Sequence, residues 1–173
     1  KNGRWEVVGG MWVEPDCNLP SGESWMRQLL YANRYFRKRL GAHATIGWNP
    51  DSFGYDWNMP QFYANAGITT FITQKMGWSE GNIFPYHLFW WEGPDGSRIL
   101  CYFPFDYVNA VDDPYRTIDQ LRQFEANTGY RNMLILFGVG DHGGGPSNDM
   151  LDRIEHLKTL DVFPSIEDGT AGN

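Results

Sequence analysis

The sequence predicts an α/β domain built on a mainly parallel sheet. Apolar runs of strand length alternate with stretches whose apolar residues recur at helical spacing, which is the order of elements in parallel α/β folds. Residues 133–137 form a continuous apolar run, as strands do when both of their faces are buried in a parallel sheet. Polar side chains follow several runs, and the carboxyl ends of parallel strands meet at one edge of a sheet. We therefore expect a single α/β domain over residues 1–173.

Helix signals occur at four places along the chain. The first helix should begin near Ser21 or Ser24, because a serine hydroxyl accepts a hydrogen bond from the first free backbone N–H groups, and it should close at Gly41. A short helix follows Pro60 over residues 61–65. A third begins at Pro114, with Asp113 as its cap, and runs up to Gly129, and a fourth follows Pro146.

Strands are expected between these helices. The apolar runs that predict them are residues 5–8, 44–48, 68–73, 88–91, 99–103 and 133–137. Residues 92–97 contain Pro, Asp and Gly, which predicts a hairpin turn between the fourth and fifth runs.

Composition excludes several classes of protein. With 42% hydrophobic and 20% charged residues among 173, the chain is neither a disordered tail nor a membrane protein. No apolar run approaches the roughly 18 residues of a transmembrane helix. A net charge of −7 without a basic stripe argues against a nucleic-acid partner. Cys17 and Cys101 do not fix the compartment, which leaves cytoplasmic and periplasmic or secreted locations open.

The two ends of the chain and its aromatic content add two expectations. The chain starts at Lys1 without a methionine and ends in a small, polar tail, so we expect it to be a piece of a larger protein. Trp, Tyr and Phe make up 16% of the residues, and most of these rings should pack in the core. Trp and Tyr beside carboxylates also suit sugar rings, whose C–H faces stack on aromatic side chains.

Carboxylates and an imidazole follow the predicted strands. They are Glu14, Asp16, Asp51, Asp106, Asp141 and His142. Each one taken alone can be a helix cap or a turn former, as Asp51 can in its Pro-Asp-Ser-Phe-Gly sequence. His142 can belong to a glycine-rich turn, an anion cradle or a metal site. Together they predict a metal and acid–base site at the carboxyl edge of the sheet.

Ordered motifs along the chain resemble the glycoside hydrolase family 38 α-mannosidases, particularly their bacterial and cytosolic-type branch. The matching stretches are residues 9–24 (GGMWVEPDCNLPSGES), 50–55 (PDSFGY), 59–61 (MPQ), 73–75 (TQK), 84–87 (FPYH), 89–97 (FWWEGPDGS) and 138–146 (GVGDHGGGP). The resemblance implies part of a seven-stranded α/β barrel-like catalytic domain that acts with retention and binds zinc or another divalent cation.

The resemblance also implies roles for individual residues. Asp51 falls on the nucleophile, which is also a metal ligand, and His142 on a second metal ligand. The other two ligands are expected from a His-x-Asp motif outside this chain. Asp106 is the candidate general acid. The candidate substrate-binding residues are Trp12, Glu14, Asp16, Trp48, Phe53, Tyr55 and Asp141.

The expected function is hydrolysis of terminal α-mannosides by the parent protein. With half of the metal ligands absent, the isolated chain should be inactive or weak, and an exposed sheet edge should favour self-association. Two alternatives stay open. One is a metal-dependent carbohydrate deacetylase or amidohydrolase-like barrel, and the other is a non-catalytic carbohydrate-binding module, which would be a β-sandwich.

Overall fold

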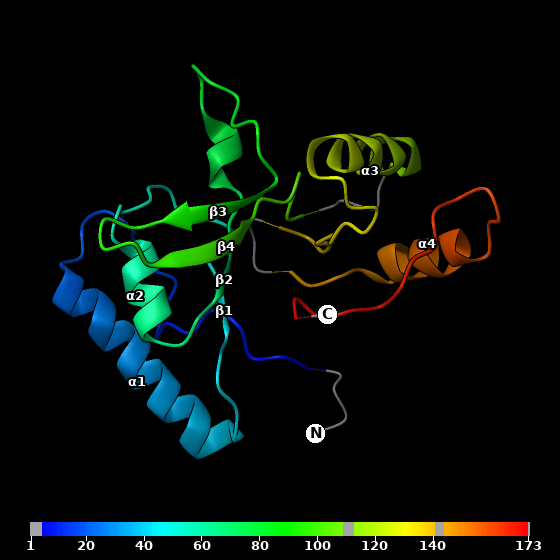
Figure 1. Ribbon diagram of the computed structural model, residues 1–173. Coiled ribbons are helices and arrows are strands. Elements are labelled where there is room, and N and C mark those ends of the chain that lie inside the picture. Colours follow the sequence, from blue (N-terminus) through cyan, green and yellow to red (C-terminus); the bar gives the residue numbers. More distant parts are fainter. Residues whose placement is uncertain (1–4, 109–112, 141–143, 173) are drawn as a thin grey trace. The chain divides into compact units, whose positions relative to one another are not determined.

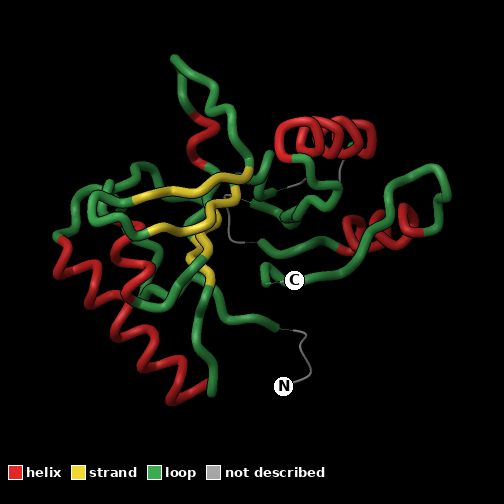
Figure 2. The backbone as a smooth tube through the Cα atoms, viewed as in Figure 1, coloured by secondary structure: helices red, strands yellow, loops and turns green. Residues whose placement is uncertain are grey.

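A computed structural model describes residues 5–108, 113–140 and 144–172 of the chain. The elements are α1 (Gly22–Leu40), β1 (Ile46–Trp48), α2 (Met59–Asn65), β2 (Thr70–Ile72), the 3-10 helix η1 (Lys75–Trp78), β3 (Leu88–Glu92), β4 (Arg98–Tyr102), α3 (Pro114–Thr128) and α4 (Asn148–Lys158) (Figures 1 and 2). They fall into two compact units, Lys1–Phe103 with Thr170–Asn173, and Pro104–Gly169. Whether both units belong to one domain, as expected from the sequence, stays a prediction.

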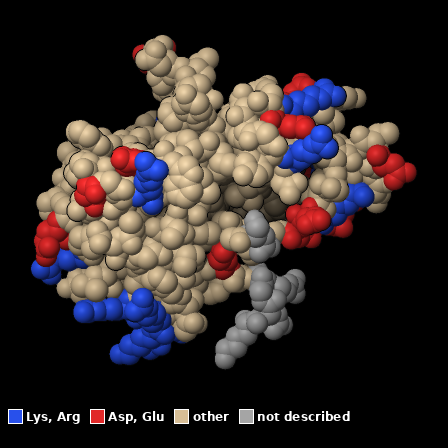
Figure 3. All heavy atoms as spheres, viewed as in Figure 1, with Lys and Arg blue, Asp and Glu red and all other residues tan. Residues whose placement is uncertain are grey.

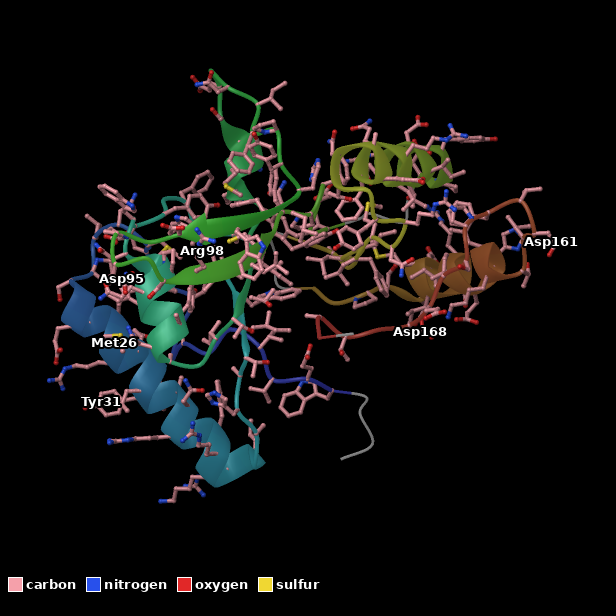
Figure 4. The ribbon with its side chains drawn as sticks, viewed as in Figure 1. Met26, Tyr31, Asp95, Arg98, Asp161 and Asp168 are labelled. Carbon is pink, nitrogen blue, oxygen red and sulfur yellow. The ribbon has the colours of Figure 1, made fainter. Side chains whose placement is uncertain are left out.

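The sheet belongs to the first unit and is mainly parallel, which confirms the predicted α/β class. Its strand order is β1-β2-β4-β3. β2 pairs in parallel with both β1 and β4, and β3 is antiparallel to β4. The predicted hairpin joins β3 to β4, with the Gly93 N–H donating to Ser97 O at 2.8 Å. In Figure 4, Asp95 lies at this turn, where its Oδ1 accepts from the Ser97 N–H at 3.0 Å, and Arg98 follows on β4.

Helix α2 packs on one face of the sheet, and α1 packs on α2. Gly47, Phe71 and Cys101 stand side by side in the register of β1, β2 and β4, so their side-chain positions share that face. Tyr63 of α2 covers this row, with its ring 5.2 Å from that of Phe71. Trp25 of α1 packs on Tyr63 in turn, ring edge to ring face at 5.9 Å. All of these side chains except Gly47 belong to one buried cluster.

Both ends of α1 follow the predicted capping. The Ser21 hydroxyl accepts from the Ser24 N–H, and Gly41 closes the helix with a φ of 63°. Arg37, Lys38 and Arg39 occupy the last turn, where positive charge interacts favourably with the helix dipole. Figure 3 shows a group of basic side chains at this end of α1, and elsewhere on the visible face acidic and basic groups are interspersed.

Two predicted strands are wrong. Residues 5–8 and 133–137 are not in strands, although the Gly9 N–H donates to Ile46 O at 2.8 Å. Residues 133–137 are half-buried, and Ile135 and Phe137 pack on Met150 and Ile154 of α4. An apolar run becomes a strand only when a neighbouring strand takes its backbone hydrogen bonds, and the described residues include no strand that pairs with this run.

Helices long and apolar enough to span a membrane are absent from the part of the chain that the structure describes.

Candidate active site

The carboxyl ends of β1 and β2 bring two loops of the first unit together. Beyond β1, the Asn49 N–H donates to Ile72 O at 3.0 Å, and beyond β2, the Thr73 N–H donates to Tyr102 O at 3.3 Å. The parallel pairing therefore continues past the strand ends. The chain then leaves the sheet toward Asp51 in one loop and Lys75 in the next, at the edge where the sequence predicted a site.

Asp51 lies between a carboxylate and an ammonium group. Its backbone N–H donates to Glu14 Oε1 at 3.2 Å, and its Oδ1 lies 2.7 Å from Lys75 Nζ. The Asp51 side chain is 51% exposed, whereas that of Lys75 is 4% exposed. The structure thus joins a buried cation to a carboxylate that faces solvent. An ammonium at this distance favours the ionised form of the carboxylate, which is the form that acts as a nucleophile.

Two aromatic rings hold the Lys75 ammonium. Its Nζ lies 4.1 Å from the ring centroid of Trp78 and 5.1 Å from that of Phe53. The two rings contact each other edge to face, with centroids 5.9 Å apart. Both distances from Nζ lie within the range of favourable cation–π contacts. Phe53 was predicted as a pocket wall, and in the structure it flanks the cation beside Asp51.

Lys75 and Trp78 were missed as site residues by reasoning from the sequence. A signal was present for Lys75, because it comes two residues after the predicted strand 68–73 and is thereby placed at the carboxyl edge of the sheet. Its burial had no signal, since most lysines are exposed and the sequence does not show which rings will surround one.

Buried contacts fix the loop that precedes Asp51. The Asn49 side chain is 2% exposed and donates through Nδ2 to Cys17 Sγ at 3.1 Å. Ser52 Oγ donates to Pro15 O at 2.8 Å. Burial raises the pKa of the Cys17 thiol to about 11, so it is a neutral thiol near pH 7. These contacts join residues 14–17 to residues 49–52 and limit the movement of Asp51.

A hollow of about 430 Å³ lies next to Lys75. It is lined by Tyr55, Lys75, Met76, Trp78, Ser79, Asn82, Ile83, Phe84 and Pro85. The Tyr55 hydroxyl lies 2.8 Å from Thr73 Oγ1, and burial raises the pKa of Tyr55. Tyr55 thus combines a partly buried ring with a hydrogen-bonded hydroxyl at the wall of this hollow, and its role toward a substrate stays a prediction.

Other predicted binding residues have contacts of different kinds. The Trp12 ring is 56% exposed and packs edge to face on Tyr35 of α1 at 5.5 Å. Asp16 Oδ1 accepts from the backbone N–H groups of Asn18 and Leu19, each at 2.8 Å, and these bonds lower the pKa of the Asp16 carboxyl. Asp16 therefore forms a turn, whereas Trp48 ends β1. Their roles toward a substrate stay predictions.

The remaining predicted residues lie in the second unit or outside the described residues. Asp106 belongs to the second unit, where its Oδ1 accepts from the Tyr107 N–H at 2.8 Å and its Oδ2 from Arg116 Nη2 at 3.2 Å. The role of Asp106 as general acid stays a prediction. Asp141 and His142 lie outside the described residues.

Asp51 is the only predicted metal ligand among the described residues, because His142 lies outside them. Groups of three or more His, Cys, Asp or Glu side chains that could hold a metal ion do not occur among the described residues. Asp51 offers the hard oxygen donor that a divalent cation takes, with one of its two oxygens already beside Lys75. The described residues therefore do not form a metal site by themselves.

Comparison with known proteins decides the family. The sequence pattern of the Glycosyl hydrolases family 38 N-terminal domain matches residues 1–173. The chain belongs to glycosyl hydrolase family 38. This family 38 chain is 41% identical over 170 residues to Alpha-mannosidase 2C1 of Homo sapiens, covering 95% of the chain and 16% of that protein. It is 40% identical over 172 residues to the Alpha-mannosidase of Saccharomyces cerevisiae, covering 94% of the chain and 16% of that protein.

A solved structure supports the fold of this family 38 chain. An alpha-mannosidase from Enterococcus faecalis V583 superposes with a TM-score of 0.69 at 22% sequence identity, over 95% of this chain and 20% of that one. At this identity the likeness concerns the fold alone. The chain thus spans about a sixth of the length of the curated relatives named above, 16% in each case.

Proposed function

We propose that this chain forms part of the catalytic domain of an α-mannosidase that acts with retention of configuration. The observation that carries the proposal is the half-exposed Asp51 carboxylate, which is paired with Lys75 at the carboxyl edge of a parallel sheet. Family membership supports the reaction class, since relatives that match nearly the whole chain are named alpha-mannosidases. The proposed substrate is a terminal α-mannoside.

Asp51 acts as the nucleophile in the proposed reaction. One of its oxygens forms a bond to the anomeric carbon, the bond from that carbon to the leaving oxygen breaks, and a general acid gives its proton to the leaving oxygen. Water then attacks the same carbon and gives up a proton to the same group. The electron pair of the ester bond returns to Asp51. Two inversions give net retention, and Asp106 is the candidate for the acid and base.

Zinc is proposed on the basis of the resemblance. Asp51 and His142 would hold it together with a His-x-Asp motif outside this chain. When bound, zinc would orient the sugar through its hydroxyls and stabilise negative charge.

Exposed rings and a carboxylate around Asp51 suit a sugar. Phe53 and Trp78 are 58% and 63% exposed, so each keeps ring surface available beside the cation that it contacts. Glu14 is bonded to the Asp51 N–H and is exposed, which leaves it within reach of a hydroxyl. Apolar ring faces next to charged oxygen acceptors match the alternating C–H and O–H groups of a pyranose.

The test uses the full-length protein and an aryl α-mannoside. Wild-type protein should release the aryl group, and NMR of the first product should show the α-anomer. The Asp51→Asn variant should lose activity on the order of 1,000-fold or more, because the nucleophile is removed while the side chain keeps its shape. Thermal unfolding checks that the variant is folded.

Other outcomes would select other functions. A β-anomer as first product would contradict a retaining mechanism, and near-normal turnover by folded Asp51→Asn would contradict the nucleophile assignment. Release of acetate from an acetylated sugar, without cleavage of the mannoside, would support the deacetylase alternative. The carbohydrate-binding module alternative required a β-sandwich, which the mainly parallel sheet contradicts.

A further inference from the structure

The buried ammonium group of Lys75 forms an ion pair with the proposed nucleophile, Asp51. Lys75 Nζ lies 2.7 Å from Asp51 Oδ1, and the lysine side chain is nearly withdrawn from solvent. We propose that Lys75 is a positioning residue that orients the Asp51 carboxylate for attack and stabilises the negative charge that returns to it when the glycosyl-enzyme is hydrolysed. This inference rests on the proposed function and adds a residue to it.

Local structure places the ammonium between two rings. Lys75 and Trp78 are the first and last residues of η1, and side chains three positions apart lie above one another in a 3-10 helix. The Trp78 ring accordingly lies 4.1 Å from Nζ. Phe53 approaches at 5.1 Å from the loop that carries Asp51. The ion pair and its two rings thus tie the loop after β1 to the loop after β2.

Stability alone does not account for a lysine at this position. Withdrawing an ammonium group from water is unfavourable, and an apolar side chain of similar length would avoid that cost. What the ammonium supplies is a fixed positive charge next to a carboxylate that loses and regains its negative charge during the reaction. The effect of such a charge is larger where water is excluded, as it is around Lys75.

The charge matters most in the second step of the reaction. While Asp51 is an ester it carries no net charge. When water attacks the anomeric carbon, the bond from that carbon to the Asp51 oxygen breaks and its electron pair returns to the carboxylate. The ammonium then faces a full negative charge, so it lowers the barrier to this step more than it stabilises the ester.

The experiment measures how fast a trapped ester is hydrolysed in the full-length protein. A fluorinated mannosyl fluoride transfers its sugar to Asp51 with loss of fluoride, and mass spectrometry locates the ester. Excess reagent is removed and the return of activity is followed. This first-order rate constant does not depend on the fraction of folded protein, so it separates the proposed role from a loss of stability.

The variants are Lys75→Met, Lys75→Arg and Trp78→Leu. We expect Lys75→Met, which keeps the length without the charge, to slow reactivation on the order of 100-fold. Lys75→Arg should recover most of the rate, because a guanidinium also pairs with carboxylates and stacks on rings. Trp78→Leu should slow it by about two- to fivefold, since the ring is worth about 0.5–1 kcal/mol to the cation. Because the slowed step follows formation of the ester, kcat and the KM of the aryl mannoside should fall together, while kcat/KM changes far less.

Lys158→Met provides the matched control. Lys158 also forms ion pairs, with Glu155 and Asp168 at 2.8 and 2.9 Å, in the second unit. This variant should reactivate at the wild-type rate. Reactivation of Lys75→Met at the wild-type rate would overturn the inference and leave the proposed function intact. Wild-type protein that forms no ester at Asp51 would overturn both.

Discussion

The phenol ring of Tyr63 lies 3.0 Å from the position that a Cβ atom on Gly47 would occupy. Gly47 is the middle residue of β1 and stands beside Phe71 of β2 in the sheet register. The ring of Phe71 lies 3.1 Å from the same position, so a methyl group there would require both rings to shift by a few tenths of an ångström. The strand that leads to Asp51, β1, therefore packs closely against α2 at Gly47.

Gly47→Ala should destabilise the protein. The added methyl group forces two buried rings to shift by a few tenths of an ångström, and overpacking a core in this way typically costs about 1–3 kcal/mol of unfolding free energy. Chemical denaturation measures the change. Gly81→Ala is the control, because a Cβ there meets nothing within 4 Å and should change stability by less than about 0.5 kcal/mol. Equal stability of the two variants would contradict the packing described for β1.

Cys17 and Cys101 should resist thiol reagents in the folded protein. Burial raises the pKa of Cys17 to about 11 and that of Cys101 to about 12, and the reacting species is the thiolate. At pH 8 we expect labelling of both residues only after unfolding in urea, measured by mass spectrometry of the peptides that contain them. Rapid labelling of either residue in native protein would show that its surroundings open to solvent.

The same thiols should make the fold sensitive to alkali. In the unfolded chain a thiol loses its proton near its ordinary pKa of 9.0, while the folded protein keeps it up to about 11 and 12. The unfolded state therefore binds fewer protons in this window, and stability falls as pH rises from 9 toward 12. The melting temperature should drop less between pH 8 and pH 10.5 in Cys101→Val than in wild type. An equal drop would assign the alkaline transition to other groups.

The general acid can be located by the choice of leaving group. Loss of the acid slows hydrolysis of substrates with poor leaving groups by about 100-fold or more and spares those with activated ones. If Asp106 is the acid, Asp106→Asn should show this pattern in the full-length protein. Asp141→Asn is the comparison, since Asp141 follows another apolar run. If Asp141→Asn selectively slows substrates with poor leaving groups while Asp106→Asn turns over normally, Asp141 and not Asp106 is the general acid. Arg116→Gln removes the ion pair but keeps the Asp106 carboxylate, and it tests for a purely structural role.

Metal content tests the ligand assignments. Zinc bound by the full-length protein should fall from about one ion per chain to well below one in Asp51→Asn and in His142→Ala, because each variant removes one of about four ligands. Elemental analysis after removal of loosely bound metal gives the ratio. Asp16→Asn is the control, because the Asp16 carboxylate is engaged by the N–H groups of its own turn. Full zinc content in either ligand variant would show that the ligand lies elsewhere.

The helices and the central strands could be predicted because their signals are local. Ser21, Gly41, Asp113 and Gly129 all cap helices as expected. The parallel edge and the exposed Asp51 at its carboxyl end also followed from the order of the apolar runs. For the helices, the residues that cap the free backbone groups lie next to the helix in the sequence.

Contacts between distant segments were beyond the reach of the sequence. Residues 133–137 look like a buried strand, yet pairing depends on a neighbour elsewhere in space, and they pack on α4 instead. Lys75 was missed for the same reason, because its partner Asp51 lies in another loop. The sequence by itself determined that Asp51 follows a strand in a parallel sheet. Only the tertiary structure decided that Lys75 lies against it, because burial and pairing of a charge depend on which loops and rings the fold brings together.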